Sequence, residues 1–250
     1  MTIRARPATL NDLDLGLLIQ ERNRGDELVG RSASLESWRR LFQDPFFASL
    51  AVVSLPPIKG HELIGFGASI FVSSAFADAE ITNPQPGLNS RVIESIHAGR
   101  SVLLTRKQVA CANANEGIDV VILQASCWLY ELLDDSQNHE VQTILPSKFT
   151  EWHAGYRLHR ILCETTDQNA REHVMRSIVY RMMGDFQDHG TALHLMTRES
   201  AKAVPGSLGN TLFEYREPVL CLRGSDQELL LAALSGATDM QLASQLALTL

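Results

Sequence analysis

Three histidines in the second half of the chain are close enough in sequence to suggest a metal site. His153 lies at the end of a predicted helix, His159 in a predicted strand and His173 in the next predicted helix. Histidine ligands on one helix are commonly four residues apart, so that both rings lie on the same face, and these three positions offer no such pair. We therefore expect no metal ion at these side chains.

The cysteines indicate neither a zinc site nor a disulfide framework. The chain has four cysteines, Cys111, Cys127, Cys163 and Cys221. No two of them form a Cys-x-x-Cys pair, and none has a histidine at zinc-ligand spacing. Three of them lie in apolar surroundings, where a buried free thiol is the usual outcome. The glycines of Gly65-Phe-Gly-Ala-Ser69 lack a strand–turn–helix context, so we expect small residues in a strand rather than a nucleotide loop or a nucleophile elbow.

Composition excludes a globally basic nucleic-acid binder. The 250 residues are 45% hydrophobic and 20% charged, with a net charge of −7. The N-terminus lacks the apolar core of a signal peptide, and no segment reaches the roughly 18 apolar residues that a membrane span needs. We expect a soluble, cytoplasmic protein with no membrane partner.

Alternation of strand and helix patterns predicts an α/β fold, a mixed sheet with helices on both faces. The predicted strands cover residues 2–8, 49–55, 61–72, 118–127, 156–165, 192–198 and 211–223. The predicted helices start at Thr9 and after Ser34, and cover 90–99, 101–117, 138–154 and 169–183, with a helical insert at about 84–116. The helix between 118–126 and 157–164 is a short crossover, so these two strands should be parallel and adjacent.

This order of elements, with "IRARPATLNDLD" at its head, resembles the GNAT acetyltransferase fold over residues 3–222. The likeness continues in "FTEWHAGYRLHRILCE" and in "RSIVYRMMGDF", where Tyr180, Gly184 and, one residue late, Phe186 are similar to a Tyr-x-x-x-Gly-Phe segment of the family. The resemblance implies that Tyr180 stands where many members have their general acid. The other interpretation of Tyr180 is a helix residue packed on the sheet with its hydroxyl at the rim.

The resemblance also implies an acetyl-CoA loop, which this sequence lacks. Active members carry Gln/Arg-x-x-Gly-x-Gly/Ala after the fourth strand, and its backbone N–H groups hold the pyrophosphate. Here no glycine occurs from Trp128 through Ala154, and Asp134 and Asp135 would repel an anion. We therefore expect no cofactor and no catalytic residue, with Tyr180 catalytic only if the chain is a divergent acyltransferase.

The end of the chain, residues 223–250, resembles the first two helices of a LuxR-type helix-turn-helix. Gly236 is expected to end the first helix, and Thr238 and Gln241 form a capping box for the second. The matching positions are Leu222, Glu228, Leu230, Gly236, Thr238, Leu242, Ala243, Leu246, Leu248 and Thr249. Thr249 would be the N-cap of the recognition helix that enters the major groove. Residues 224–250 contain no Lys or Arg and carry a charge of −3, so we expect DNA binding only from a longer product.

These features predict a LuxR-type transcription regulator, in which residues 1–222 form a non-catalytic sensory or dimerisation domain. We expect a homodimer, because the apolar face of the C-terminal helical pair would otherwise be exposed, and the large domain could hold an unidentified small-molecule ligand. The alternative is a divergent N-acyltransferase acting on an unknown small amine. A third hypothesis is an interaction protein that dimerises through residues 84–116.

Overall fold

The computed structural model describes residues 2–13, 31–58, 61–127, 133–166, 171, 174 and 179–214. The chain divides into two units, Met1–Tyr215 and Arg216–Leu250, and all the described residues belong to the first. The helix-turn-helix predicted at 223–250 lies outside the described residues, and so do its scaffold positions from Glu228 to Thr249.

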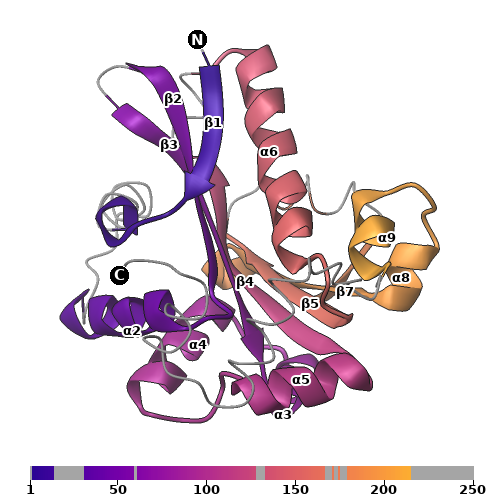
Figure 1. Cartoon of the computed structure of the whole chain (residues 1–250). Helices are drawn as coiled ribbons and strands as arrows, with labels where there is room; N and C mark the ends of the chain where they lie inside the picture. The colour runs from indigo at the N-terminus through magenta and orange to yellow at the C-terminus, as the bar shows by residue number, and fades with distance from the viewer. Residues whose placement is uncertain are drawn as a thin grey trace, which may run out of the picture. The chain divides into compact units, whose positions relative to one another are not determined.

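The strands of the described part form one seven-stranded sheet in the order β1-β2-β3-β4-β5-β7-β6 (Figure 1). Their bounds are β1 Thr2–Pro7, β2 Ala48–Ile58, β3 His61–Val72, β4 Ile118–Cys127, β5 Leu158–Thr165, β6 Tyr180–Phe186 and β7 Thr191–Thr197. Neighbouring strands are antiparallel except for β4 and β5, which are parallel. The predicted α/β fold class and the parallel central pair are confirmed.

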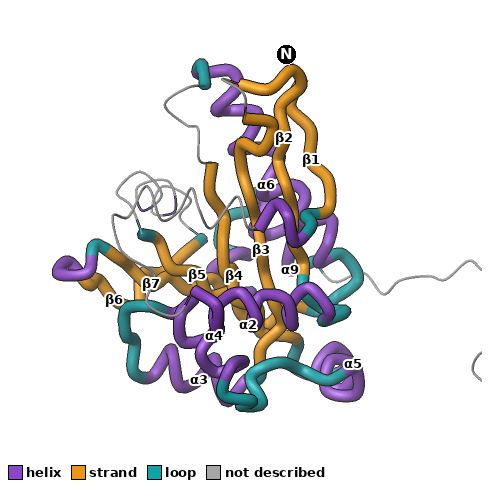
Figure 2. The backbone as a smooth tube through the Cα atoms, turned by 90° about the vertical axis from the view of Figure 1, so that its left-hand side faces the viewer, coloured by secondary structure: helices purple, strands orange, loops and turns teal. Residues whose placement is uncertain are grey.

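Helices cover both faces of this sheet, as predicted. Their bounds are α2 Arg31–Gln43, α3 Ser74–Thr82, α4 Leu88–His97, α5 Arg106–Ala114, α6 Asp135–His153, α8 Arg198–Lys202 and α9 Leu208–Phe213. Side chains of α2, α3 and α4 share one apolar cluster with alternate residues of β3, β4, β5 and β7, and Figure 2 shows α2 and α4 in front of the sheet. Side chains of α5, α6, α8 and α9 pack against the opposite set of strand residues.

Strand β2 continues through Pro56 and Pro57, where the sequence predicted that it would stop. The two prolines have no registered partner on either side, since pairing with β1 ends at Leu55 and pairing with β3 resumes only at Ile58. Their missing N–H groups therefore remove no bond from the sheet.

The insert between β3 and β4 is longer than predicted and differs inside. It begins with α3, which follows its N-cap Ser73, and α4 starts at Leu88 behind the left-handed Gly87. The helix predicted at 101–117 is confined to Arg106–Ala114, because the capping box of Thr105 starts it late. Before that box, Leu103 forms a bridge with Val72 of β3.

Two predictions near the second sheet edge were wrong. The helix predicted at 169–183 cannot extend to its end, because Tyr180–Met183 lie in β6 and the first three of these residues pair with β7. The first residues of the strand predicted at 211–223 lie instead in α9, which Ser207 caps by accepting from the backbone N–H of Asn210, and residues 215–223 are outside the described residues. Cross-strand pairing determines the strand at 180–186, and a helix cap determines the helix at 208–213. The apolar pattern of the sequence alone indicates neither the pairing nor the cap.

Candidate functional site

The parallel strands β4 and β5 stop pairing halfway along β4. Their register runs from Ile118 opposite Leu158 to Ile122 opposite Cys163, whereas β4 continues to Cys127. On its other side β4 pairs with β3, where Ile122 faces Ser69 and Gln124 faces Ala68, so Leu123 is one extra residue. Such a bulge bends a strand and interrupts its ladder. Beyond Leu123, no described strand pairs with the β5-facing edge of β4 (Figure 2).

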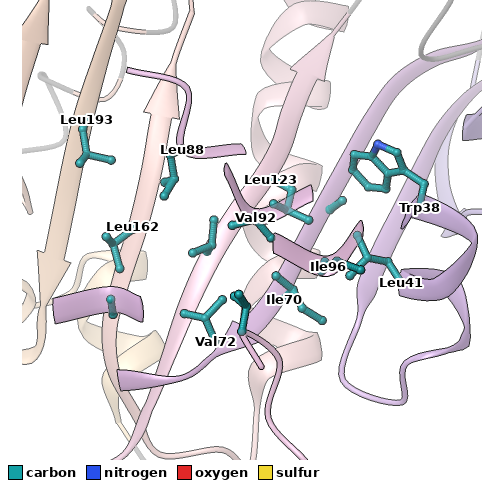
Figure 3. Close-up of a cluster of buried hydrophobic side chains, with 14 of the residues drawn as sticks. Trp38, Leu41, Ile70, Val72, Leu88, Val92, Ile96, Leu123, Leu162 and Leu193 are labelled. Atoms are coloured by element: carbon teal, nitrogen blue, oxygen red, sulfur yellow. The ribbon is translucent and has the colours of Figure 1, made fainter. Parts of the chain in front are cut away.

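The insert bridges the two strands at this point on one face of the sheet. The backbone N–H of Gly87 donates to Oε1 of Glu164 on β5 at 2.6 Å. Nδ2 of Asn89 donates to the carbonyl oxygen of Leu123 on β4 at 2.7 Å. Between them Leu88 is fully buried, in a cluster with leucines of β4, β5 and β7 (Figure 3). Residues 87–89 are therefore fixed to both strands where the strands separate.

Two arginines fix the insert, one within itself and one against the sheet. Arg91 pairs with the buried Glu80 through two nitrogens and also donates to the carbonyl oxygens of Gln85 and Pro86, which fixes the turn before Gly87. This network stays within the insert and keeps its turn rigid.

The second arginine, Arg160 of β5, joins the insert to the sheet. It makes two bonds of 2.8 Å to the buried Asp119 of β4 and one of 2.6 Å to Asp78 of α3. Hydrogen bonding to Asp119 raises the pKa of Arg160 above its ordinary value, so the guanidinium stays charged across the physiological range. These bonds hold the insert that carries residues 87–89 in a fixed position against β5.

Tyr180 lies on the opposite face of the same region. It is on strand β6, so the interpretation as a helix residue was wrong, and it is partly buried against the cluster of α8 and α9. Its hydroxyl interacts with Cys163, the last residue of β5 that pairs with β4. Burial, together with Cys163, raises the pKa of Tyr180 well above its ordinary value. The phenol therefore keeps its proton at neutral pH.

Cys163 is a buried free thiol, as predicted, whereas Cys111 is exposed. Burial raises the pKa of Cys163 to about 12, so the nucleophilic thiolate is absent at neutral pH. Its cross-strand neighbour is His194 of β7, which is fully buried and lies with Nε2 3.0 Å from Oγ1 of Thr165. Burial also lowers the pKa of His194. The face therefore carries neutral polar groups.

The predicted histidines do not meet at one point. His153 is buried in α6, where Nδ1 donates to the carbonyl oxygen of Phe149 at 2.7 Å and Nε2 lies 3.3 Å from Oγ of Ser69. Nδ1 of His159 on β5 lies 3.2 Å from Oδ1 of Asp119, and His173 is outside the described residues. Within the part of the chain that the structure describes, no group of three or more His, Cys, Asp or Glu side chains could hold a metal ion.

The N-terminus of helix α6 is capped by the carboxylate of Asp134. The Asp134 side chain accepts from the backbone N–H of Gln137 at 2.9 Å, and the Gln137 side chain accepts from the backbone N–H of Asp134 at 3.0 Å. An incoming phosphate would meet this carboxylate instead of free N–H groups. Residues 128–132, the rest of the glycine-free turn, lie outside the described residues.

Glu164, Asn89 and Leu123 are not among the residues that the sequence predicted for a site. The sequence around Gly87 carries no signal that this segment reaches β5. The only hint was the Pro-Gly step directly before an apolar helix, which is compatible with many docking positions.

The seven-stranded mixed sheet with its parallel β4–β5 pair matches the GNAT-like fold that the sequence predicted. Among solved structures, the chain is similar to FeeM, an N-acyl amino acid synthase from uncultured soil microbes, at 12% identity and a TM-score of 0.44, covering 82% of this chain and 96% of FeeM. It is also similar to Arabidopsis thaliana NAA60 in complex with a bisubstrate analogue, at 16% identity and a TM-score of 0.46, covering 78% and 99%. A third likeness is to an acetyltransferase from Streptococcus agalactiae, at 8% identity and a TM-score of 0.45, covering 78% and 98%. At these identities and TM-scores the likenesses say nothing about chemistry or substrate.

No protein-family model matches the chain, and no curated protein matches it by sequence. None of the helices in the described ranges has the length and apolar character to cross a bilayer.

Proposed function

We propose that this chain is an acyltransferase that moves an acyl group from a thioester to a small amine. The observation that carries the proposal is the end of β4–β5 pairing at Ile122 and Cys163, with β4 continuing to Cys127. An unpaired strand edge offers backbone donors and acceptors to an extended ligand, which can add to it as a strand would. The pantetheine arm of a thioester donor is extended and contains two amide groups that suit such an edge.

Tyr180 is the proton donor in this proposal. The amine nitrogen attacks the thioester carbonyl carbon, the C–S bond breaks, and the departing thiolate takes the phenolic proton of Tyr180. An acceptor that binds as an ammonium first gives one proton to water, which frees its nitrogen for the attack. The proton that the nitrogen loses after the attack passes through water to the phenolate, which restores Tyr180. The phenol is protonated at neutral pH, and its hydroxyl lies at Cys163, where the strands separate.

The donor is not held through a pyrophosphate in this proposal. The sequence from Trp128 through Ala154 has no glycine, and the carboxylate of Asp134 caps α6. We therefore expect only weak binding of acetyl-CoA, measured by calorimetric titration, and similar transfer rates from acetyl-CoA and acetyl-pantetheine. Micromolar affinity for acetyl-CoA would contradict this part of the proposal.

The test is a transfer assay on the full chain with acetyl-pantetheine, acetyl-CoA and longer acyl thioesters against a set of primary amines, read by mass spectrometry. We expect an N-acyl product, and a fall in kcat of about 100-fold or more in Tyr180→Phe, as for loss of a general acid. Tyr156→Phe is the matched control, because Tyr156 packs in the same cluster. No product from any donor and amine would refute the proposal.

A second proposed function is DNA binding by the helix-turn-helix pattern of residues 223–250. The capping box of Thr238 and Gln241 and the apolar positions Leu242, Ala243 and Leu246 support it. In gel-shift titrations against the upstream region of its own gene, we expect binding from a chain extended through a recognition helix and none from residues 1–250. Selective binding by residues 1–250 would contradict this expectation, and an extended chain that binds no DNA would remove the regulator hypothesis.

A further inference from the structure

We propose that Asn89 and Glu164 form the binding site for the protonated amine of the acyl acceptor. This inference rests on the proposed acyltransferase function and adds to it the residues that recognise the acceptor. Both side chains lie on the face of the sheet that carries the insert. Glu164 is on β5, and Asn89 is on α4 and bonds to Leu123 of β4, next to the point where the pairing of the two strands ends.

The amide of Asn89 can point in only one direction. A carbonyl oxygen accepts hydrogen bonds and cannot donate them, so the group that faces the Leu123 carbonyl at 2.7 Å must be the Nδ2 amide. The other end of the amide, Oδ1, is buried, and no partner for it is found among the described residues. A buried acceptor without a donor is unfavourable, and a bound ligand that donates a hydrogen bond would remove that penalty.

Glu164 supplies the second acceptor and a negative charge. Its Oε1 accepts from the backbone N–H of Gly87 at 2.6 Å, which fixes the carboxylate next to the first turn of α4. The side chain is half-buried, and within the described residues neither a cation nor a donor is paired with Oε2. One carboxylate oxygen thus positions the group while the other stays available.

The pair fits an ammonium group better than a hydroxyl. An ammonium has three N–H donors and no acceptor, so it can bond to Asn89 Oδ1 and Glu164 Oε2 together and neutralise the carboxylate. A hydroxyl has one donor and leaves one of the two oxygens unsatisfied. The separation of β4 and β5 lies between the two side chains, so an amine held there is next to the strand edge proposed for the donor arm.

Binding can be measured without catalysis, through the backbone amide of Gly87. In the ¹⁵N-labelled full chain, we expect butylammonium chloride to shift the Gly87 amide resonance in a saturable manner, whereas butanol does not. Glu164→Gln should abolish the shift, because the glutamine oxygen still accepts from Gly87 but its charge is gone. Glu94→Gln is the matched control, since Glu94 is an exposed carboxylate on the same helix α4.

Kinetics give the second readout. In Glu164→Gln the KM for the amine should rise about 10-fold or more, as for loss of a hydrogen bond to a charged group. The KM for the thioester should stay within about twofold, because the substitution acts on acceptor binding alone. Should Glu164→Gln fail to fold, Asn89→Ser tests the same site: its hydroxyl can still donate towards Leu123, but the free amide oxygen is lost.

The outcomes separate this inference from the proposed function. A Gly87 shift that depends on Glu164, without acyl transfer, would sustain the amine site and remove the acyltransferase. Acyl transfer with an unchanged amine KM in Glu164→Gln would sustain the enzyme and overturn the site. Equal shifts with butanol and butylammonium would mean that the site does not select for an ammonium group, which also overturns it.

Discussion

Gly117 is the residue at which the parallel pair begins, and we predict that Gly117→Ala destabilises the protein strongly. It has a φ of +108°, in the region that favours glycine, and it comes directly before Ile118, whose N–H donates to the Arg157 carbonyl at 2.8 Å. A Cβ at Gly117 would lie 2.9 Å from that same carbonyl oxygen and 3.1 Å from the backbone nitrogen of His159. The neighbours are backbone atoms, so they cannot move aside as a flexible side chain would.

Gly155 provides a control that separates two contributions to this loss. Its φ is +90°, but a Cβ there would have no atom within 4 Å. Gly155→Ala should therefore cost only the backbone strain of a positive φ, about 1–2 kcal/mol. Gly117→Ala carries a similar strain plus a steric clash of about 1–3 kcal/mol, for a total of roughly 2–5 kcal/mol.

Urea unfolding followed by circular dichroism measures both variants. With a slope of about 2–3 kcal/mol per molar urea, the Gly117→Ala midpoint should fall by roughly 1–2 M, and the Gly155→Ala midpoint by less than about 1 M. Equal midpoints in the two variants would refute the reasoning, because they would show that β5 approaches Gly117 less closely than the structure has it.

Three further predictions concern the core and the charged groups. Leu88→Ala should lower the free energy of unfolding by about 2–5 kcal/mol in thermal melts, whereas Leu10→Ala, at a side chain 41% exposed, should change it by less than about 0.5 kcal/mol. Burial lowers the pKa of His153 from 6.5 to about 4, so as the pH falls the unfolded chain binds a proton at this side chain before the folded protein does. The free energy of unfolding should therefore be highest above about pH 6.5 and fall by roughly 2 kcal/mol by pH 5. His153→Gln should remove that slope in urea titrations. Asp119→Ala leaves the buried side of Arg160 without its partner and should cost about 3–5 kcal/mol in urea unfolding, against less than about 1 kcal/mol for the exposed Asp78→Ala. A flat pH profile, or equal losses within either pair, would contradict the corresponding prediction.

The central sheet could be predicted because its signals are local. Residues 118–122 are rich in β-branched side chains, and the crossover to residues 156–165 is short enough to require a parallel neighbour. The helix start at Thr9 could be predicted for the same reason, because Asp12 lies three residues away and accepts from the Thr9 backbone N–H at 2.7 Å. Patterns of this kind depend on residues close in sequence, so they can be read before any tertiary structure is known.

The candidate site could not be predicted because it depends on docking. The bulge at Leu123 exists only relative to the register with β3, which the uniform apolar run does not reveal. Asn89 and Glu164 lie in segments far apart in sequence, and they approach the same point only because the insert packs against β5. Tyr180 fits a helical pattern, yet its pairing with Met196 of β7 places it in a strand.

The insert leaves the sheet after Val72 and returns before Asp119, and these two residues face each other across β3 and β4. Because the insert enters and leaves the sheet at one point, it could be replaced as a whole by a short β-hairpin turn that joins β3 and β4 directly. Closing the long loop between them costs about 2 kcal/mol more in chain entropy than closing a hairpin of a few residues. Because that cost is met before any contact repays it, β3 and β4 should pair late in folding, after the insert has formed its helices. Grafting the insert between the corresponding strands of another sheet would then transfer residues 87–89 as one piece, and only the glutamate on β5 would have to be supplied by the host.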